Sequence, residues 1–424
     1  MPLVGGARLP LAFIGGGLLA LAAGALWLAL IGICGWPAYF HPHLVGLVHL
    51  WLPGALLSIC LGASYQLMPV VLGTPLRAGS TLLWTHAGLH VMGVILLVAG
   101  LTGGHYLTAG GGGLALVAGV CGLIGVTLRT FPRSTRRDTA AWSFPLSASW
   151  LGATVLAGVM LAVNRRAPFL SLDTVALLRA HAHLGLAGYF LTLLQGVTFQ
   201  LVPMFTLGEA RHPRQAAWGL AGTQVALLLL VPGLAWGWPP AISGGTLLLL
   251  LSLGNTARAF IATLATRRRR SLDPGVRAFV TGLLFLAFAA LGGGALALGL
   301  VGPAHRLTGE AAYGLLVALG GLSLCVLGLL CKILPFLVWM KAYGPHVGRR
   351  PVPVATALAS RGLELLWWVT HVGGTVLLTV GVLGDIPVPT GLGAGLVTFG
   401  VCAYLANAGR VLLHLRSHAR IAPS

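Results

Sequence analysis

Long hydrophobic runs alternate with short polar segments along the whole chain. Each run is long enough, as a helix, to cross a hydrocarbon layer roughly 30 Å thick. The pattern therefore predicts an all-α integral membrane protein with twelve transmembrane helices. We expect these spans near residues 10–34, 43–72, 80–103, 110–130, 142–163, 176–207, 215–236, 240–264, 276–300, 309–340, 358–383 and 388–414.

The composition agrees with a membrane protein. Of the 424 residues, 57% are hydrophobic and 8% are charged, whereas about 25% of residues are charged in soluble proteins. The net charge of +19 does not indicate a nucleic-acid partner, because the arginines are divided among short loops and form no single face. The six cysteines lie in or beside hydrophobic runs and are interpreted as small apolar residues rather than disulfide partners.

Basic residues are concentrated in alternate loops, which predicts the orientation of the chain. One side carries the segments TFPRSTRRD (130–138) and ATRRRRSLD (265–273), while the other has mainly Arg165, Arg166 and Arg306. The positive-inside rule then places both termini in the cytoplasm. We expect a multi-pass protein of the bacterial cytoplasmic (inner) membrane, with the lipid bilayer as its surroundings.

Three columns of residues recur near the ends of spans 2, 6 and 10, at spacings of 134 and 132 residues. They are Pro69, Pro203 and Pro335; Gly62, Gly196 and Gly328; and Gln66, Gln200 and Lys332. Such repetition predicts one transmembrane domain built from three pseudo-symmetric four-helix units. The units are expected at about 10–130, 142–264 and 276–414, with each proline ending its span.

Two histidines occupy equivalent positions in this repeat. His49 and His183 each lie twenty residues before the recurring proline, where the third unit has Leu315. Polar side chains within a span are energetically expensive and are functional candidates by default. A neutral imidazole is a common axial ligand of haem iron, so we interpret the pair as ligands of b-type haem. Hydrogen bonding between helices is the alternative interpretation.

Other polar residues extend this prediction. His181 and His43 are the next candidate haem ligands, and Arg179 and Arg306 are candidate partners of the haem propionates, although both are equally compatible with ordinary interfacial arginines. The neighbouring glycines 46, 185 and 188 are expected to leave room for a flat ring.

A second metal site is a further candidate. His86 and His90 share one helical face and, with His371, could hold copper or a second haem. A hydrogen-bonded polar pair is the alternative. Among the few acidic residues, only Glu364 looks well inside a span, and Lys332 is the main other buried ionisable residue.

The segments AHAHLGLAGYF (180–190) and HLVGLVHLW (43–51) resemble helices of the catalytic subunit of haem-copper oxidases and nitric oxide reductases. In that family an HxH helix supplies one axial ligand to each of two haems, and a histidine of the second span completes the low-spin haem. The resemblance implies the same twelve-helix plan. It departs from the family because the HxH lies on span 6 instead of span 10 and the usual copper ligands are absent. In plan, the chain is also similar to NnrS-like haem proteins linked to nitric oxide response.

These patterns favour a membrane protein with one or two b-type haems near the external face. Its expected role is electron transfer, or the binding or reduction of nitric oxide or oxygen, with a cytochrome or quinol as electron donor. Bound copper remains an open option, and whether the protein is an oxidoreductase enzyme is left open. The alternatives are a twelve-helix secondary transporter and a copper- or haem-handling assembly protein.

Overall fold

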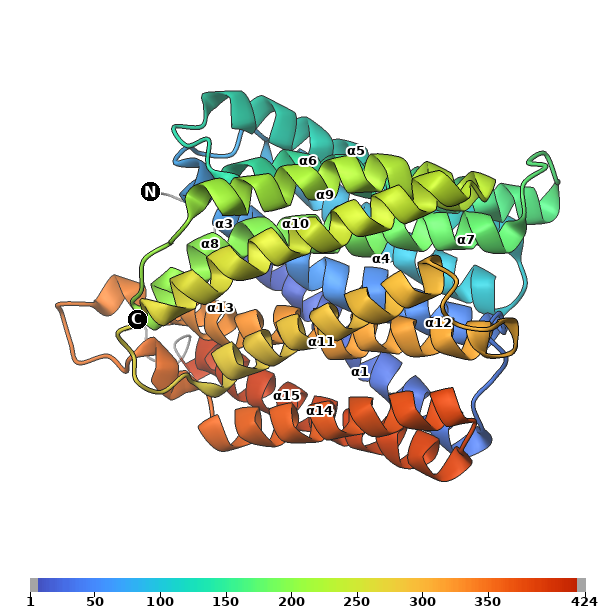
Figure 1. Cartoon of the computed structure of the whole chain (residues 1–424). Helices are drawn as coiled ribbons and strands as arrows, with labels where there is room; N and C mark the ends of the chain where they lie inside the picture. The colour runs from blue at the N-terminus through green and yellow to red at the C-terminus, as the bar shows by residue number, and fades with distance from the viewer. Residues whose placement is uncertain (1–6, 418–424) are drawn as a thin grey trace. The chain divides into compact units, whose positions relative to one another are not determined.

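The computed structural model describes residues 7–417, which fold into helices joined by short loops (Figure 1). The elements of the first half are α1 (Arg8–Cys34), α2 (Pro42–His49), η1 (Leu50–Leu57), α3 (Ser58–Leu72), α4 (Ser80–Thr102), α5 (Tyr106–Thr130), η2 (Phe131–Arg133), α6 (Thr139–Arg166), α7 (Thr174–His183), η3 (Leu184–Leu191) and α8 (Thr192–Thr206). Those of the second half are α9 (Pro213–Trp236), α10 (Pro239–Ala265), α11 (Pro274–Ala297), η4 (Pro303–His305), α12 (Arg306–Leu315), η5 (Leu316–Ser323), α13 (Leu324–Ala342), η6 (Gly344–His346), η7 (Ala355–Leu358), α14 (Arg361–Gly384) and α15 (Pro387–Ser417).

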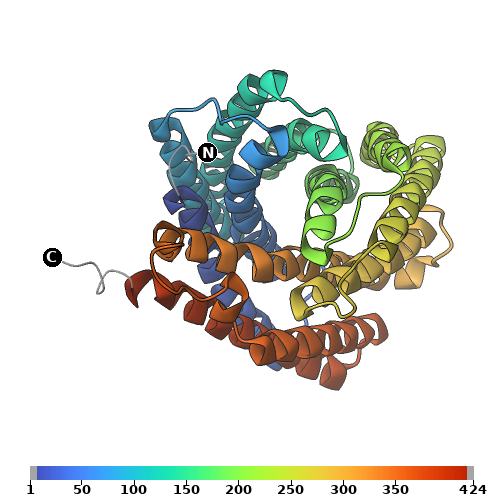
Figure 2. The ribbon, with the colours of Figure 1, turned by 90° about the vertical axis from the view of Figure 1, so that its left-hand side faces the viewer.

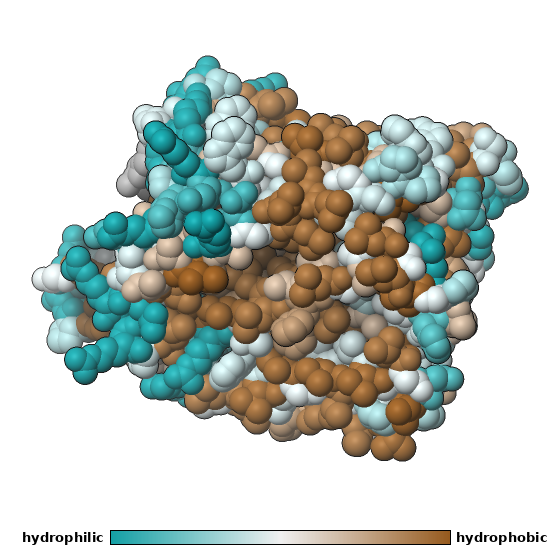
Figure 3. All heavy atoms as spheres, in the orientation of Figure 1, coloured by the Kyte–Doolittle hydropathy of each residue, from teal (hydrophilic) through white to brown (hydrophobic). Residues whose placement is uncertain are grey.

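Twelve of the described helices are long and apolar enough to cross a membrane, which confirms the predicted number. Span 2 consists of α2, η1 and α3, span 6 of α7, η3 and α8, and span 10 of η4, α12, η5 and α13. On the face shown in Figure 3, hydrophobic side chains cover the lengths of the helices and hydrophilic side chains gather towards their ends. The structure thus indicates a multi-pass membrane protein.

The described residues form two compact units. Unit 1 contains residues 64–272 and 289–306, and unit 2 contains residues 7–63, 273–288 and 307–417. Within unit 1, α4 packs against α5, α9 against α10, and α6 against α8 and η3. Within unit 2, α14 and α15 lie side by side (Figure 2), and α1 packs against α15 and η1. The arrangement of three pseudo-symmetric four-helix units remains a prediction.

Each of spans 2, 6 and 10 contains a π-helix, in which the backbone hydrogen bonds are wider than in an α-helix. The three π-helices, η1, η3 and η5, begin 134 and 132 residues apart, the same spacings as the recurring residues. A hydroxyl at the end of each donates to a carbonyl oxygen within it. These bonds run from Ser58 to Gly54 (2.6 Å), from Thr192 to Ala187 (3.3 Å) and from Ser323 to Ala318 (2.7 Å). The sequence repeat therefore corresponds to a repeated feature of the backbone.

The recurring glycines allow close contact with the first helix of each predicted repeat. A methyl group at any of the three positions would meet backbone atoms of α1, α6 or α11. The nearest backbone oxygens would be those of Pro10 (2.7 Å) at Gly62, Thr139 (3.0 Å) at Gly196 and Gly275 (2.6 Å) at Gly328. The recurring prolines lie near the ends of their spans, as predicted, and α3, α8 and α13 continue beyond them to Leu72, Thr206 and Ala342.

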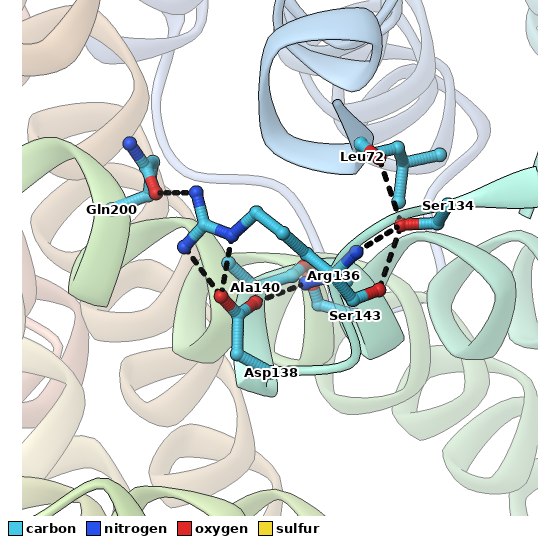
Figure 4. A network of polar contacts seen from close by, with 8 residues as sticks. Leu72, Ser134, Arg136, Asp138, Ala140, Ser143 and Gln200 are labelled. Atoms are coloured by element: carbon cyan, nitrogen blue, oxygen red, sulfur yellow. Dashed lines mark hydrogen bonds and ion pairs between the residues drawn. The ribbon is translucent and has the colours of Figure 1, made fainter. Parts of the chain in front are cut away.

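The third recurring column connects spans 6 and 10 to the aspartates that begin α6 and α11. In unit 1, the Arg136 guanidinium donates to Gln200 Oε1 (2.9 Å) and, through Nε, to Asp138 (2.8 Å), which accepts the backbone N–H of Ala141 (Figure 4). In unit 2, Lys332 forms an ion pair directly with Asp273. Gln200 is thus connected to the start of α6 through Arg136, and Lys332 is connected directly to the start of α11.

Candidate functional site

His49 and His183 have the same local geometry. Each is the last residue of an α-helix and is followed at once by a π-helix. The Nδ1 atom of His49 lies 2.8 Å from the Val45 carbonyl oxygen, and that of His183 lies 2.8 Å from the Arg179 carbonyl oxygen. Because a carbonyl can only accept, Nδ1 of both rings must carry the proton. In the neutral imidazole the lone pair is then on Nε2.

This tautomer is the one expected of a histidine that binds a metal through Nε2. Metal-ligating histidines usually donate their other ring N–H to a carbonyl or carboxylate, and this bond fixes the ring orientation. Both side chains are half-buried. The residue types and tautomers therefore fit axial ligation of haem iron. The equivalent residue of the third repeat, Leu315, ends α12 in the same way but has no donor atom.

The two secondary candidates have different surroundings. His181 faces α6, where its Cε1 atom lies 3.2 Å from the position that a methyl group on Gly158 would occupy. His43 is exposed at the start of α2, where its backbone N–H donates to Nδ1 of His41 (3.3 Å) and its ring packs edge-on against Trp27. These contacts belong to helix packing and helix capping, and they leave His49 and His183 as the better candidates.

The expectation that Gly185 and Gly188 leave room for a ring is wrong, whereas for Gly46 it stays a prediction. A methyl group on Gly185 would lie 3.3 Å from the Thr154 side chain, and one on Gly188 would lie 2.9 Å from the Trp150 side chain. Both neighbours belong to α6. The glycines instead allow η3 to pack closely against α6.

The two candidate propionate partners differ in exposure. Arg179 is half-buried on α7, and its own carbonyl oxygen accepts the hydrogen bond from His183. Arg306 is exposed at the first residue of α12. Arg179 is thus tied to the candidate ligand through the backbone, whereas its role towards a propionate remains a prediction.

The three histidines of the second candidate metal site are divided between the two units. His86 and His90 lie buried on α4 in unit 1, with ring centroids 6.3 Å apart, and His86 Nδ1 lies 2.6 Å from the Tyr65 hydroxyl oxygen. His371 lies in unit 2, where its Nε2 donates to the Leu319 carbonyl oxygen of η5 (3.0 Å). Within residues 7–417, no three or more His, Cys, Asp or Glu side chains are grouped to hold a metal ion.

Tyr65 was not predicted from the sequence as a partner of His86. It directly precedes Gln66 of the recurring columns, so its depth in the span could have been inferred. The rotamer that brings its hydroxyl to His86 could not have been inferred from the sequence.

Comparison with protein-family models gave no match, and comparison with curated proteins gave none either. The resemblance of spans 2 and 6 to the oxidase and reductase family therefore stays a prediction from their sequence motifs.

Proposed function

We propose that this protein is a membrane-bound b-type haem protein in which His49, in unit 2, and His183, in unit 1, each serve as an axial ligand of haem iron. The proposal rests on a hydrogen bond that both rings make. In each, Nδ1 donates to a backbone carbonyl oxygen at 2.8 Å. That bond orients each ring and leaves the Nε2 lone pair as the donor that haem iron requires. It recurs at equivalent positions of two repeats, beside equivalent π-helices.

The proposed role is electron transfer, or the binding or reduction of nitric oxide or oxygen, in a protein related to the oxidase catalytic subunit. Bound haem would supply reversible one-electron chemistry and an iron that binds diatomic gases. This chain would supply the axial imidazoles and an apolar, water-poor environment. Arg179 and Arg306 would neutralise propionates. The proposed electron donor is a cytochrome or quinol, and the proposed location is the bacterial inner membrane with both termini cytoplasmic.

Haem content and ligation can be tested on the full chain, expressed under haem-replete conditions and purified in detergent. Reduced-minus-oxidised spectra give the spin state, and a pyridine haemochrome assay gives the haem type and the number of haems per chain. We expect a low-spin b-type spectrum that His49→Ala and His183→Ala each weaken or convert to high-spin. His371→Ala is the matched control, because its Nε2 is committed to the Leu319 carbonyl oxygen.

Other outcomes would overturn the proposal in distinguishable ways. A preparation without a Soret band rejects haem binding, and bound copper without haem would favour the metal-handling alternative. Equal spectral loss in all three variants would show general unfolding instead of ligation. A haem spectrum unchanged by both alanine variants would reject these two ligands. Without haem or metal, the transporter alternative becomes the one to pursue.

A further inference from the structure

A second polar cluster lies in unit 2, on residues that the proposed haem ligation does not use. Glu364 of α14 is only 6% exposed. It contacts the Cys331 thiol and lies within electrostatic range of Lys332, both on α13. Lys332 forms an ion pair with Asp273, at the start of α11. The buried Glu364 carboxyl thus lies beside an ion pair whose two charges have opposite signs and offset each other.

The remaining neighbours of Glu364 complete the surroundings of the carboxyl. Arg361 lies one turn earlier on the same helix and is exposed. Tyr404, on α15, contacts Cys331 and donates its hydroxyl hydrogen to the Leu327 carbonyl oxygen (3.0 Å). The charged residues that act on Glu364 are therefore Lys332, Asp273 and Arg361.

These surroundings act on the carboxyl in opposite directions. Burial and the negative charge of Asp273 favour the neutral acid. Lys332, Arg361 and the N-terminal end of α14 favour the carboxylate. Lys332 is paired with Asp273, so its charge is not available to the Glu364 carboxylate alone. Both protonation states of Glu364 therefore have groups in this cluster that favour them.

Glu364 lies close to one solvent-exposed end of its helix. Arg361 is exposed to solvent three residues away, about 4.5 Å along the helix axis. One turn further in the other direction, Trp367 is completely buried. The solvent-exposed Arg361 end of α14 is therefore the end nearer to Glu364, whereas the next turn inward holds the buried Trp367 indole.

We infer that Glu364 is a proton-binding site that exchanges its proton with water at the Arg361 end of α14. In the exchange the carboxyl O–H bond breaks and a water molecule accepts the proton, or the reverse, and no electron is transferred. The site does not depend on haem, so the two proposals can fail separately.

Infrared difference spectroscopy of the full chain in lipid tests this inference. Spectra are recorded between about pH 5 and pH 9, a range that lies above ordinary carboxyl pKa values and spans raised ones, in H₂O and in D₂O. We expect a carbonyl band of a protonated carboxylic acid that changes with pH, shifts in D₂O and disappears in Glu364→Gln. Glu310→Gln is the matched control, since Glu310 is a second buried glutamate, on α12 and 8% exposed.

The inference is overturned if no such band occurs, if it is insensitive to pH and D₂O, or if Glu310→Gln removes it instead. If Glu364→Gln fails to fold, Glu364→Asp replaces it, because aspartate keeps a titratable carboxyl. The band should then shift in frequency, and an unshifted band would assign the proton to another residue.

Discussion

Trp51 and Ser323 are 272 residues apart in the chain, yet the Trp51 indole N–H donates to Ser323 Oγ over 2.8 Å. Trp51 belongs to η1 and Ser323 ends η5, so this bond joins two π-helices within unit 2. The Ser323 hydroxyl in turn donates to the Ala318 carbonyl oxygen of η5 (2.7 Å). One buried hydroxyl thus satisfies a donor and an acceptor in an apolar interior, where unsatisfied polar groups are costly.

Ser323→Ala is expected to destabilise the protein. The substitution leaves both the Trp51 N–H and the Ala318 carbonyl without these bonds, and a buried unsatisfied group costs about 1–3 kcal/mol. The loss should appear as a lower thermal midpoint of the helical circular dichroism signal in detergent. Ser323→Thr keeps the hydroxyl and serves as the control. A midpoint for Ser323→Ala equal to that of the wild type would contradict this contribution of the hydroxyl.

Gly328→Ala is expected to force α13 away from α11. The added methyl carbon would lie 2.6 Å from the Gly275 carbonyl oxygen and 2.9 Å from the Phe279 backbone nitrogen. Backbone atoms cannot move aside as a flexible side chain can, and overpacking costs about 1–3 kcal/mol. Gly254→Ala, where nothing lies within 4 Å, is the control. The measurement is the heat-resistant monodisperse fraction in size-exclusion chromatography, and equal fractions would contradict the close packing.

The spans were predictable from the sequence because a hydrophobic run of about twenty residues with few charges is typical of a membrane-spanning helix. The recurring glycines were also predictable as a repeated feature, since contact with a neighbouring helix excludes a Cβ atom at each position. The π-helices were not predictable. Their sequences are mainly leucine, alanine and glycine, and only η1 contains a proline, Pro53. Each π-helix is accompanied by a hydroxyl hydrogen bond and by a neighbouring helix packed against it, which the local sequence does not show.

At the candidate site, too, the sequence predicts some features of the histidines and not others. Their matched depth followed from the repeat alone, but their tautomers depend on rotamers that bring Nδ1 to a carbonyl oxygen. The wrong expectation concerned Gly185 and Gly188, because the sequence does not show that α6 side chains fill the space beside them. Small residues in a span indicate close approach without identifying the neighbour.

Lys332→Gln, which introduces the glutamine of the other two repeats, is expected to destabilise unit 2. Asp273 loses its ion pair with Lys332, and removing one member of a buried pair costs roughly 3–5 kcal/mol. The pair is partly accessible here, with side chains 14% and 23% exposed, so the cost should be smaller.

Adding Asp273→Asn should recover part of that loss, because asparagine removes the charge that Lys332 had paired and still caps α11. Thermal midpoints of the two single variants and the double variant give the coupling between the residues. Additive effects would show that the ion pair contributes nothing beyond its separate contacts.

Added imidazole should distinguish lost ligation from lost structure. His183→Gly removes the ring and its bond to the Arg179 carbonyl oxygen but leaves the volume of an imidazole within the helix packing. If Nε2 of this ring binds haem iron, millimolar imidazole should restore the low-spin spectrum, and the same treatment should restore His49→Gly. His371→Gly is the control, and its spectrum should not respond, because that ring donates to Leu319 through Nε2. A His183→Gly protein that folds, retains haem and shows an unaltered low-spin spectrum before imidazole is added would exclude His183 as an axial ligand.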